Sequence, residues 1–501
     1  MNTMKKSSLL FTICLIVILL VGCKDYLNLP PKNVRAVISL TDAKRVLGGY
    51  LEKFALVASS TINSMPGPAV TYTADQISMF NAYSDDIDFA EALVSSYIAP
   101  QPTKPESYYA NLLLFNDFTT PTTIWNSYYS CVGFTNVLIS QIDAINEDNQ
   151  TLRNQLKGEL LIHRAFHIFK LLEYFAPYND AKEGIPVYLK AGIENFTNPR
   201  KSQKEVYQII INDLEEALKL IAITPPKEGF NIWYNTRYIN NLLAQVYWFK
   251  AESAAKENDD YKNAKKYALE ATKNTDAFIP KTVDDIYKAI QGKLQGYPAY
   301  MNSPSMQAGV AGLFGAVYMN YSPTNIKIDT ELFNLYSNSD IRYSAYFKVV
   351  DGIGTINPIW PDGTSPAWKR GQFLEFQPEE AFLILAEAHY RMNETNESIA
   401  VLNRFKSFRN AGTAVGLSGT QLLNEIKNER RKEFFCLKDS RWIALKRYGD
   451  VTISREFVFF QKLYSLVVPP NSFRYALPIP LTELAINPDL TDNPGWLPIV
   501  F

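Results

Sequence analysis

Apolar residues recur at helical spacing between residues 156 and 175, in the segment LKGELLIHRAFHIFKLLEYF. They form two neighbouring rows. The first row is Leu161, Ala165, Ile168, Leu172 and Phe175, and the second is Ile162, Phe166 and Phe169. Steps of three and four residues keep each row on one face, so two rows predict a helix that is buried over most of its circumference. Pro177 is expected to end it, because proline lacks the backbone donor and disfavours helical geometry in the preceding residue.

The same periodicity recurs along the rest of the chain, in segments that follow one another in pairs. Further helices are expected at residues 41–58, 123–146, 202–221, 236–256, 261–274, 379–392 and 396–410. Small residues at Ala264, Ala268 and Ala271 would let two helices approach closely, as in the second helix of a tetratricopeptide unit. The chain is therefore predicted to be mostly α, with about four tetratricopeptide-like helix pairs that form one curved scaffold.

Helical periodicity fails between about residues 276 and 371, a stretch dense in Gly, Pro, Asn and aromatic residues. Two shorter irregular regions are expected at residues 63–86 and 99–108. A few short β-strands are expected near residues 345–350 and 457–468. Long irregular segments in a folded protein often form functional surfaces, so these loops are the first place to look for a binding site.

The chain begins with a short apolar segment of the kind that directs secretion. Lys5 and Lys6 precede the thirteen-residue run LLFTICLIVILLV. This run is shorter than the roughly 20 residues that span a bilayer, but it suits the central region of a secretory signal. The residues that follow complete Leu20-Val21-Gly22-Cys23, which resembles a bacterial lipobox. An uncleaved signal anchor and a plain secretory signal are the alternatives.

The lipobox implies a division of the chain into three parts. Residues 1–22 are expected to be a lipoprotein signal peptide, and Cys23 is expected to carry the lipid. Residues 23–40 are then a polar, proline-interrupted tether, and residues 41–501 are a single domain that contains the irregular insert of about 276–371. With 47% hydrophobic and 20% charged residues, a domain of this length can bury a large core.

Two cysteines, Cys131 and Cys436, remain once Cys14 leaves with the signal and Cys23 takes lipid. Both lie in apolar, helix-like surroundings, and their separation gives no local disulfide framework, so two buried thiols are favoured over a disulfide. The formal net charge of −1 becomes −3 when the two lysines of the signal leave. Nucleic acid and anionic surfaces require a basic excess, so neither is expected as a partner.

Candidate metal and cofactor sites are incomplete. His163 and His167 are spaced i, i+4, as in helical zinc sites, but the only other histidine is His389 and ordinary packing is favoured. A glycine run at Gly309, Gly312 and Gly315 lacks the strand and helix context of a phosphate-binding loop. No G-x-S-x-G nucleophile motif occurs. We therefore expect no metal and no cofactor.

Charged clusters also favour a structural interpretation. Glu379 and Glu380 are adjacent on a helix, so they point in different directions and cannot flank one glycosidic bond. Arg430, Arg431 and Glu433 invite an anion-binding interpretation, but pairing of Arg430 with Glu433 at i, i+3 along a helix is favoured. The chain is accordingly not expected to be an enzyme.

Several groups of residues resemble, in chain order, the motifs of one protein family. After the lipobox they are Trp125, Tyr128, Tyr129 and Asn136; Gly158-Glu159 with Arg164-Ala165; Asp340 and Arg342; Ala386-Glu387-Ala388 with Arg391; Glu429-Arg430-Arg431 with Glu433-Phe434; Asp439, Arg441 and Trp442; and Asn493-Pro494-Gly495-Trp496. This order resembles the SusD/RagB family of outer-membrane nutrient-binding lipoproteins. Residues 41–501 are therefore expected to be one SusD-like domain.

The resemblance implies a function as well as a fold. It implies a lipid-anchored protein that faces outward on the outer membrane, captures an oligosaccharide and passes it to a partner TonB-dependent, SusC-like transporter. One alternative is the same architecture binding peptides or another nutrient. A second is a surface helical scaffold that binds only proteins.

Ligand residues are expected in the irregular loops rather than in the family motifs, which build the scaffold. Sugars present apolar C–H faces and hydroxyl rims, so flat aromatic rings together with amide groups suit them. The chain holds 30 Tyr and 7 Trp from which to choose. The candidates are Tyr72, Asn81, Tyr83, Tyr108, Tyr109, Tyr297, Tyr300, Tyr318, Tyr321 and Trp360.

Overall fold

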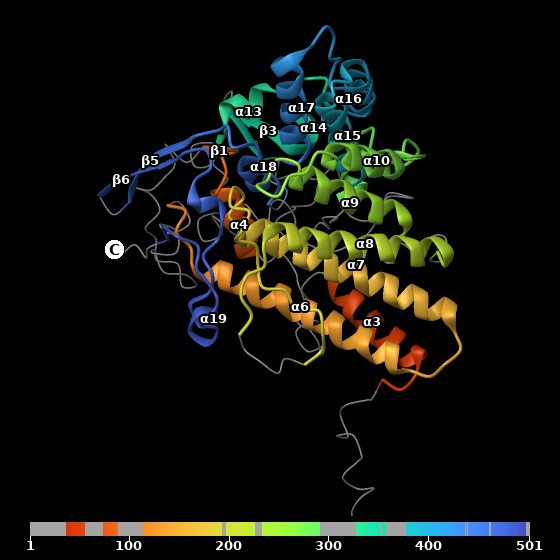
Figure 1. Cartoon of the computed structure of the whole chain (residues 1–501). Helices are drawn as coiled ribbons and strands as arrows, with labels where there is room; N and C mark the ends of the chain where they lie inside the picture. Colours follow the sequence, from red (N-terminus) through yellow and green to blue (C-terminus); the bar gives the residue numbers. More distant parts are fainter. Residues whose placement is uncertain are drawn as a thin grey trace, which may run out of the picture.

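The structure is a computed structural model of the chain (Figure 1). The described residues are 37–55, 74–88, 114–192, 197–225, 233–290, 327–350, 353–356, 377–435, 437, 439–459 and 462–496. Cys23, Cys436 and the signal segment lie outside them, and Cys131 is buried and forms no disulfide bond with a described residue. No helix among the residues described has both the length and the apolar character needed to cross a membrane.

Long helices make up most of the fold. They are α3 (Leu40–Ala55), α4 (Ala74–Ala82), α6 (Thr119–Ala144), α7 (Gln150–Phe175), α8 (Gln203–Ile223), α9 (Thr236–Lys250), α10 (Asp260–Thr272), α15 (Pro378–Arg391), α16 (Thr395–Arg409), α17 (Gly419–Glu433) and α18 (Ser440–Tyr448). From α6 to α10 each helix packs on the next, α10 packs on α15, and α15 packs on α16 and α17. Figure 1 shows the resulting stack, with α3 and α6 at one end and α16 and α17 at the other. The prediction of a mostly α scaffold of helix pairs is confirmed.

Shorter elements lie along one side of this stack. The helices are α11 (Val283–Ile290), α13 (Thr330–Asn334), α14 (Ile341–Tyr346) and α19 (Leu481–Ile486), and a 3-10 turn spans Phe473–Tyr475. The strands are β1 (Ile87–Asp88), β2 (Lys327–Ile328), β3 (Phe347–Val350), β4 (Ile353–Ile356), β5 (Ile453–Phe459) and β6 (Lys462–Val468). They form three antiparallel pairs, β1–β2, β3–β4 and β5–β6, in the described part of the chain.

The strands expected near residues 345–350 and 457–468 are therefore present, as β3 and as the β5–β6 hairpin. Residues 63–86, however, were expected to be irregular, and α4 lies within them. Within the stretch of residues 276–371, α11, α13 and α14 were not expected either. They have eight, five and six residues. Helices α13 and α14 are too short to show a repeating apolar pattern, which explains why the sequence did not reveal them. For α11 a signal was available, because Val283, Ile286, Tyr287 and Ile290 stand at i, i+3, i+4 and i+7.

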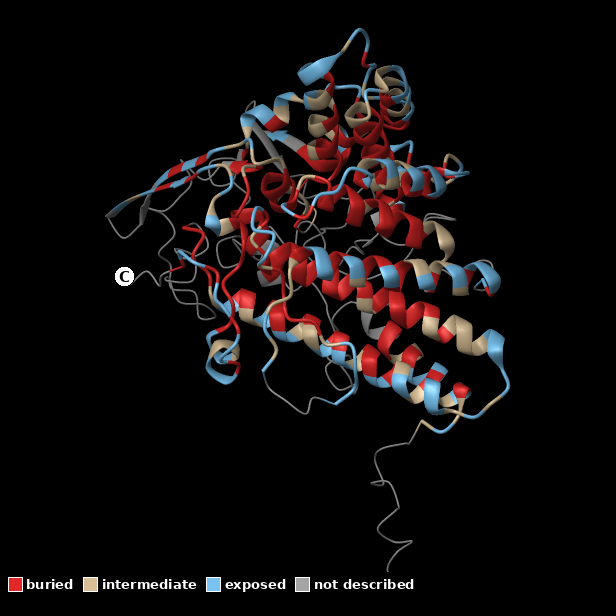
Figure 2. Cartoon of the chain, viewed as in Figure 1, coloured by how far each residue is buried: buried red, intermediate tan, exposed pale blue. Residues whose placement is uncertain are grey.

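Helix α7 is the central element, as its two apolar rows predict. It contacts α6, α8, α3 and α9, and it is buried along most of its length from Leu156 onward (Figure 2). It begins earlier than expected, at Gln150, because the side chain of Asn149 accepts a hydrogen bond from the backbone N–H of Leu152. It ends at Phe175, ahead of Pro177, as predicted.

The polar side chains on α7 form hydrogen bonds within the core. Glu159 is fully buried; one carboxyl oxygen accepts from the backbone N–H of Tyr234 at 2.9 Å, and the other lies 3.3 Å from Nε2 of His163. Burial raises the pKa of Glu159 to about 8 and lowers the pKa of His163 to about 3. Burial therefore favours the uncharged form of both side chains at neutral pH. The rings of His163 and His167 lie 6.1 Å apart inside this core.

Changing Glu159 to Gln should make the stability of the fold less dependent on pH. The folded-state pKa of about 8 lies above the ordinary value of 4.5, so the folded protein binds this proton more tightly than the unfolded chain. The resulting stability is fully present below about pH 4.5 and is lost as the pH rises through 8. Between pH 5 and pH 8.5, we expect the wild type to lose about 2–4 kcal/mol more unfolding free energy than E159Q in urea titrations.

The matched control is Glu216→Gln, on an exposed position of α8. This variant should keep the pH dependence of the wild type. Equal losses in the wild type and in E159Q would show that Glu159 is not the group responsible.

Candidate functional site

The predicted ligand residues divide into two sets. Asn81 and Tyr83 are described by the structure. The others lie outside the described residues, and they are Tyr72, Tyr108, Tyr109, Tyr297, Tyr300, Tyr318, Tyr321 and Trp360. The segments that carry them begin and end at described residues.

Asn81 and Tyr83 lie inside the protein, at the end of α4. Tyr83 is fully buried, its ring stacks on Phe115 at 4.3 Å, and its hydroxyl oxygen accepts from the backbone N–H of Asp117 at 2.8 Å. Asn81 is 4% exposed, and its side-chain nitrogen has no hydrogen-bond partner among the residues described. In this structure Tyr83 supports the segments around it, and a ligand role for either residue stays a prediction.

Three of the segments that carry the predicted aromatic residues are attached at one place. Strand β1 ends where the segment of residues 89–113 begins, and β2 begins where the segment of residues 291–326 ends. The two strands pair with Asp88 opposite Lys327, which places these attachment points about 5 Å apart. Strand β2 also contacts β4, which ends where residues 357–376 begin.

We call this region, residues 82–88, 115–117, 327–329 and 353–356, the loop base. Tyr108 and Tyr109 belong to the first attached segment, and Trp360 belongs to the third. The second carries the remaining tyrosines, namely Tyr297, Tyr300, Tyr318 and Tyr321. Attachment points that are more than 200 positions apart in the sequence thus lie together at the loop base.

Three arginines hold the loop base. Arg431 on α17 donates to the Asp86 carboxylate at 2.8 Å, to the Asp85 backbone carbonyl at 2.8 Å and to Asp329 at 3.2 Å. Arg441 on α18 makes two 2.6 Å hydrogen bonds with the Asp85 carboxylate. The third, Arg455 on β5, donates to the backbone carbonyls of residues 82 and 84.

This arrangement controls the ionisation of Asp85. Burial by itself would raise its pKa, but the guanidinium groups of Arg441 and Arg431 outweigh that effect and lower the pKa to about 2. The carboxylate therefore stays charged at physiological pH. Planar, two-pronged pairing fixes geometry as well as charge, so the loop base is a rigid anchor for the segments that leave it.

The expected pairing of Arg430 with Glu433 is wrong. Glu433 instead accepts from Arg342 on α14 at 2.8 Å and from Arg409 on α16 at 2.6 and 2.9 Å. Arg430 pairs with Glu380 on α15. Ion pairs to other helices replace the pairing along one helix because α17 is enclosed by those helices, so its charged side chains meet partners from several directions. The structural interpretation of the cluster holds, with different partners.

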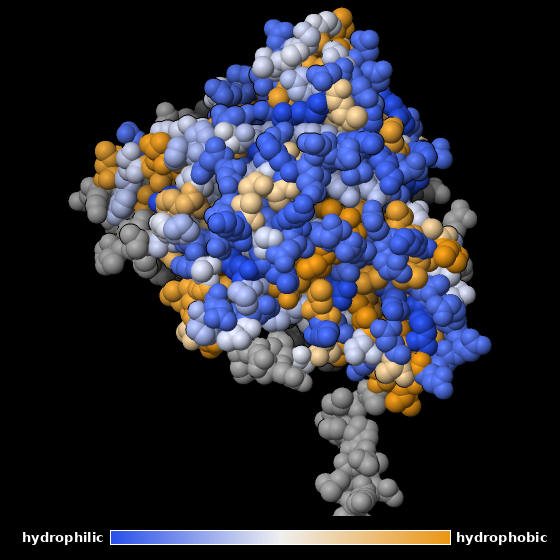
Figure 3. Space-filling model, viewed as in Figure 1, coloured by the Kyte–Doolittle hydropathy of each residue, from blue (hydrophilic) through white to orange (hydrophobic). Residues whose placement is uncertain are grey.

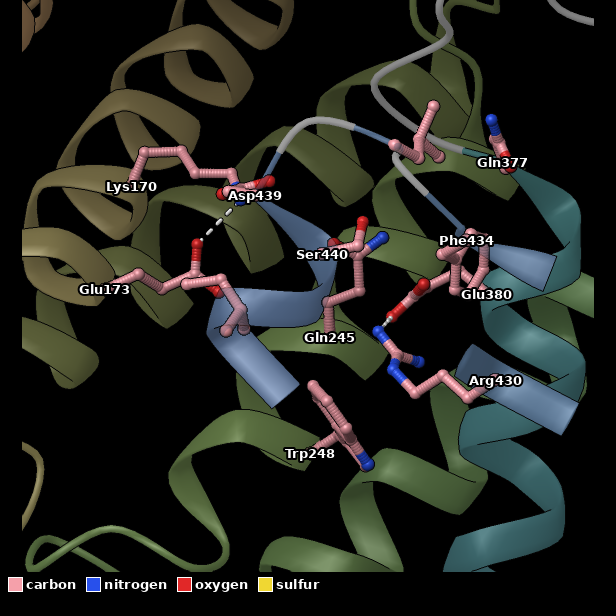
Figure 4. A pocket seen from close by; sticks show the side chains of 12 residues that line it. Lys170, Glu173, Gln245, Trp248, Gln377, Glu380, Arg430, Phe434, Asp439 and Ser440 are labelled. Carbon is pink, nitrogen blue, oxygen red and sulfur yellow. Dashed lines mark hydrogen bonds and ion pairs between the residues drawn. The ribbon is translucent and has the colours of Figure 1, made fainter. Parts of the chain in front are cut away.

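A small polar pocket lies between α7, α9, α15, α17 and α18 (Figure 4). Its volume is about 50 Å³, enough for a few water molecules and too small for a sugar ring. On one side Lys170 lies 2.8 Å from Glu173 and 2.9 Å from Asp439; on the other, Arg430 pairs with Glu380. Burial raises the pKa of Glu173 to about 7. The charges in this pocket largely satisfy one another.

Comparison with known proteins identifies the family. The family SusD-like_3, described as "Starch-binding associating with outer membrane", matches residues 70–247, and the family SusD_RagB, described as "SusD family", matches residues 379–496. The chain belongs to the SusD/RagB family.

Solved structures agree with this assignment at the level of the fold. A putative sugar binding protein from Bacteroides vulgatus ATCC 8482 has a TM-score of 0.67 and 20% identity, and the match covers 92% of this chain and 100% of that chain. A SusD superfamily protein from Bacteroides thetaiotaomicron VPI-5482 has a TM-score of 0.65 and 19% identity, with 91% and 100% covered. At such identities the likeness shows the fold alone.

A curated relative from Bacteroides ovatus, named "SusD-like protein", is 21% identical over 169 residues. That match spans 33% of this chain and 29% of the relative.

Arg164 and Asn136, two of the motif residues of this SusD/RagB protein, hold the scaffold together, as expected. Arg164 makes two 2.7 Å hydrogen bonds with Asp213 on α8, and it donates to the side-chain oxygen of Asn136 at 3.0 Å. Asn136 in turn donates to the backbone carbonyl of Tyr188 at 2.9 Å. These contacts join α6, α7, α8 and the chain near residue 188.

Sequence reasoning missed Arg455 and the paired acids of the loop base. The adjacent acids Asp85 and Asp86, next to an irregular region, were the available signal. Their partners lie about 350 positions away along the chain, in the Arg431 and Arg441 motifs. Only the fold brings the two together.

Replacing Arg431 with Ala should destabilise the protein by about 3 kcal/mol, because Asp86 would be left buried at 1% exposure without its nearest cation. The matched control is Lys427→Ala on the same helix. Lys427 pairs with Asp450, whose side chain is 45% exposed, so its loss should cost less than about 1 kcal/mol. Urea unfolding of both variants measures the difference, and similar values for the two would contradict an anchoring role for Arg431.

Proposed function

We propose that this protein captures an oligosaccharide at the cell surface and delivers it to a partner TonB-dependent, SusC-like transporter in the outer membrane. Membership of the SusD/RagB family supports the proposal, as does the description "Starch-binding associating with outer membrane" of the family that matches residues 70–247. The sugar-binding relatives in Bacteroides supply the ligand class.

The observation that carries the proposal is the convergence of three segments on the loop base. Tyr108 and Tyr109 belong to a segment that begins after β1, Trp360 belongs to one that begins after β4, and the four tyrosines of residues 291–326 belong to one that ends at β2. These three strands meet at the loop base. The aromatic rings that these segments carry offer several stacking surfaces to a chain of sugar rings. A rigid anchor lowers the entropy that binding would otherwise cost, so it favours capture by many modest contacts.

Binding without catalysis is the mechanism in this proposal. Glu379 and Glu380, the adjacent acids of α15, are engaged with Arg409 and Arg430 respectively. They therefore face different partners and do not converge on one bond, as the spacing of glycosidase carboxylates would require. The described residues contain no cluster of three or more His, Cys, Asp or Glu side chains that could hold a metal ion.

Anchoring belongs to the same proposal. Lipid on Cys23 would hold the protein at the outer membrane, and residues 23–40 would form the tether that leads to α3. Because that tether ends at the first helix of the stack, the domain can stand clear of the lipid surface while remaining close to a barrel in the same membrane.

The test uses the soluble chain from Lys24 onward in native gels that contain one polysaccharide each, with peptide mixtures run separately. We expect one glycan to retard the wild type. Trp360→Ala and Tyr300→Ala should each weaken this binding about tenfold, because each removes one stacking surface. Tyr390→Ala, a matched loss of a half-buried tyrosine on α15, should leave it unchanged.

Retardation by peptides alone would favour capture of another nutrient. Binding only to a membrane barrel, with no glycan or peptide retained, would favour a protein-interaction scaffold. Either result would overturn the proposal of oligosaccharide capture.

A further inference from the structure

A groove of about 490 Å³ opens on the outer face of α6, away from the polar pocket of Figure 4. Its floor is α6, one wall is the chain at residues 188–192, and Glu483 of α19 contributes the other. In Figure 1, α19 lies beside the N-terminal half of α6. The volume is in the range of pockets that hold small organic ligands.

Two tyrosines form a fixed aromatic wall in this groove. Tyr129 on α6 and Tyr188 lie 5.8 Å apart with their rings nearly perpendicular. The hydroxyl of Tyr129 donates to the backbone carbonyl of Pro186 at 2.7 Å, which holds its ring in place. Trp125 packs below Tyr129 at 4.6 Å and against Phe175 at 4.9 Å. Both tyrosines are partly exposed, so ring surface remains for an occupant.

Polar groups at the rim are free to bind. The side chain of Asn126 is exposed and makes no hydrogen bond with the residues described, and the same holds for Lys190. Glu483, half-buried, faces the tyrosines across the groove. One ammonium and one carboxylate leave the lining without net charge, which favours a neutral, hydroxyl-rich ligand over an anion or a cation.

A glycine in the floor of the groove, Gly133, is an observation independent of the aromatic wall and the polar rim. It lies in the interior of the 26-residue helix α6, where glycine costs about 0.5–1 kcal/mol relative to alanine. A Cβ atom added there would meet nothing within 4 Å. No internal packing constraint in the described structure therefore requires glycine at this position. Its effect is to keep the floor of the groove low between Tyr129 and Asn136, where an occupant can approach the helix backbone.

We propose that this groove is a carbohydrate-binding site distinct from the loop base. The C–H face of a sugar ring would lie on Tyr129 and Tyr188 above Gly133. Its hydroxyls would meet the Asn126 amide, the Glu483 carboxylate and the Lys190 ammonium group. The ligand class rests on the proposed function. The groove shares no residue with the segments attached to the loop base, so an experiment can contradict one binding site without contradicting the other.

The experiment measures saturation-transfer NMR with maltohexaose, cellohexaose, xylohexaose and mannohexaose on the soluble chain from Lys24 onward. In a Trp360→Ala, Tyr300→Ala background we expect one of these sugars to keep a transfer signal. Adding Gly133→Leu, whose side chain would occupy the floor of the groove beside Tyr129, should weaken that remaining binding at least tenfold. Tyr188→Ala provides a second variant that removes the wall instead of filling the floor.

Gly48→Leu is the matched control, because Gly48 is also a helix glycine with nothing within 4 Å of an added Cβ, and it lies on α3 outside the groove. It should leave the signal unchanged, and thermal unfolding of each variant verifies the fold. Loss of all binding in the loop background, or binding that Gly133→Leu and Tyr188→Ala leave intact, would overturn the groove site while the loop site stands. No transfer from any sugar to the wild type would overturn the groove site, and the gels with longer polysaccharides would then decide the loop site alone.

Discussion

The carboxyl end of α7 is the constraint on which the rest of the fold depends. A helix leaves its last carbonyl groups without partners inside the helix, and burying them unpaired would be costly. Here the carbonyl of Leu172 accepts from the backbone N–H of Ala176, and the carbonyls that follow find donors far along the chain. Lys446 donates to the backbone carbonyls of residues 173 and 176. The backbone N–H of Leu477 donates to the backbone carbonyl of residue 174 at 2.8 Å. Asn493 and Arg200 both donate to the backbone carbonyl of Phe175. The burial of α7 therefore requires α18 and the C-terminal segment to be in place, which explains why the closing Asn493-Pro494-Gly495-Trp496 motif is a structural part of the core.

A second set of long-range contacts joins the helical stack to the loop base. Arg342 is fully buried and binds Asp340, Glu429 and Glu433, and Arg409 binds Glu433 and Glu379. These ion pairs tie α14 to α15, α16 and α17. Arg431, which lies between Glu429 and Glu433 on α17, binds Asp86 of the loop base. A buried charge without a partner is strongly destabilising, so such a network tolerates few alternative arrangements of the helices around it. The position of the loop base is thus determined by the packing of helices remote from it in sequence.

The sequence predicts well what depends on local pattern. The two apolar rows of α7, the stop before Pro177 and the paired helices from α8 to α16 all follow from spacing alone. It predicts poorly what depends on pairing across the chain. Strands β1 and β2 have two residues each and lie about 240 positions apart, so neither has a pattern of its own. The predicted pairing of Arg430 with Glu433 was wrong for the same reason. Residues three positions apart on a helix lie on one face and can pair, but in an enclosed helix the side chains of neighbouring helices offer closer partners. As for the candidate site, loop composition selects aromatic residues but contains no information on where the loops attach.

The two proposed sugar sites differ in the physical basis of their specificity. At the loop base, rigid anchors hold segments whose aromatic residues come from distant parts of the sequence, so changes in those segments can alter ligand choice without disturbing the helices. In the α6 groove the recognition elements belong to the scaffold itself: Tyr129 is held by Pro186, and Asn136, beside Gly133, is held by Arg164 and bonded to Tyr188. A ligand in the groove would bind to a surface whose side chains are held nearly fixed by the core. Because Asn136 links the groove wall to Arg164 and so to α7, the shape of the groove depends on the same central helix as the fold.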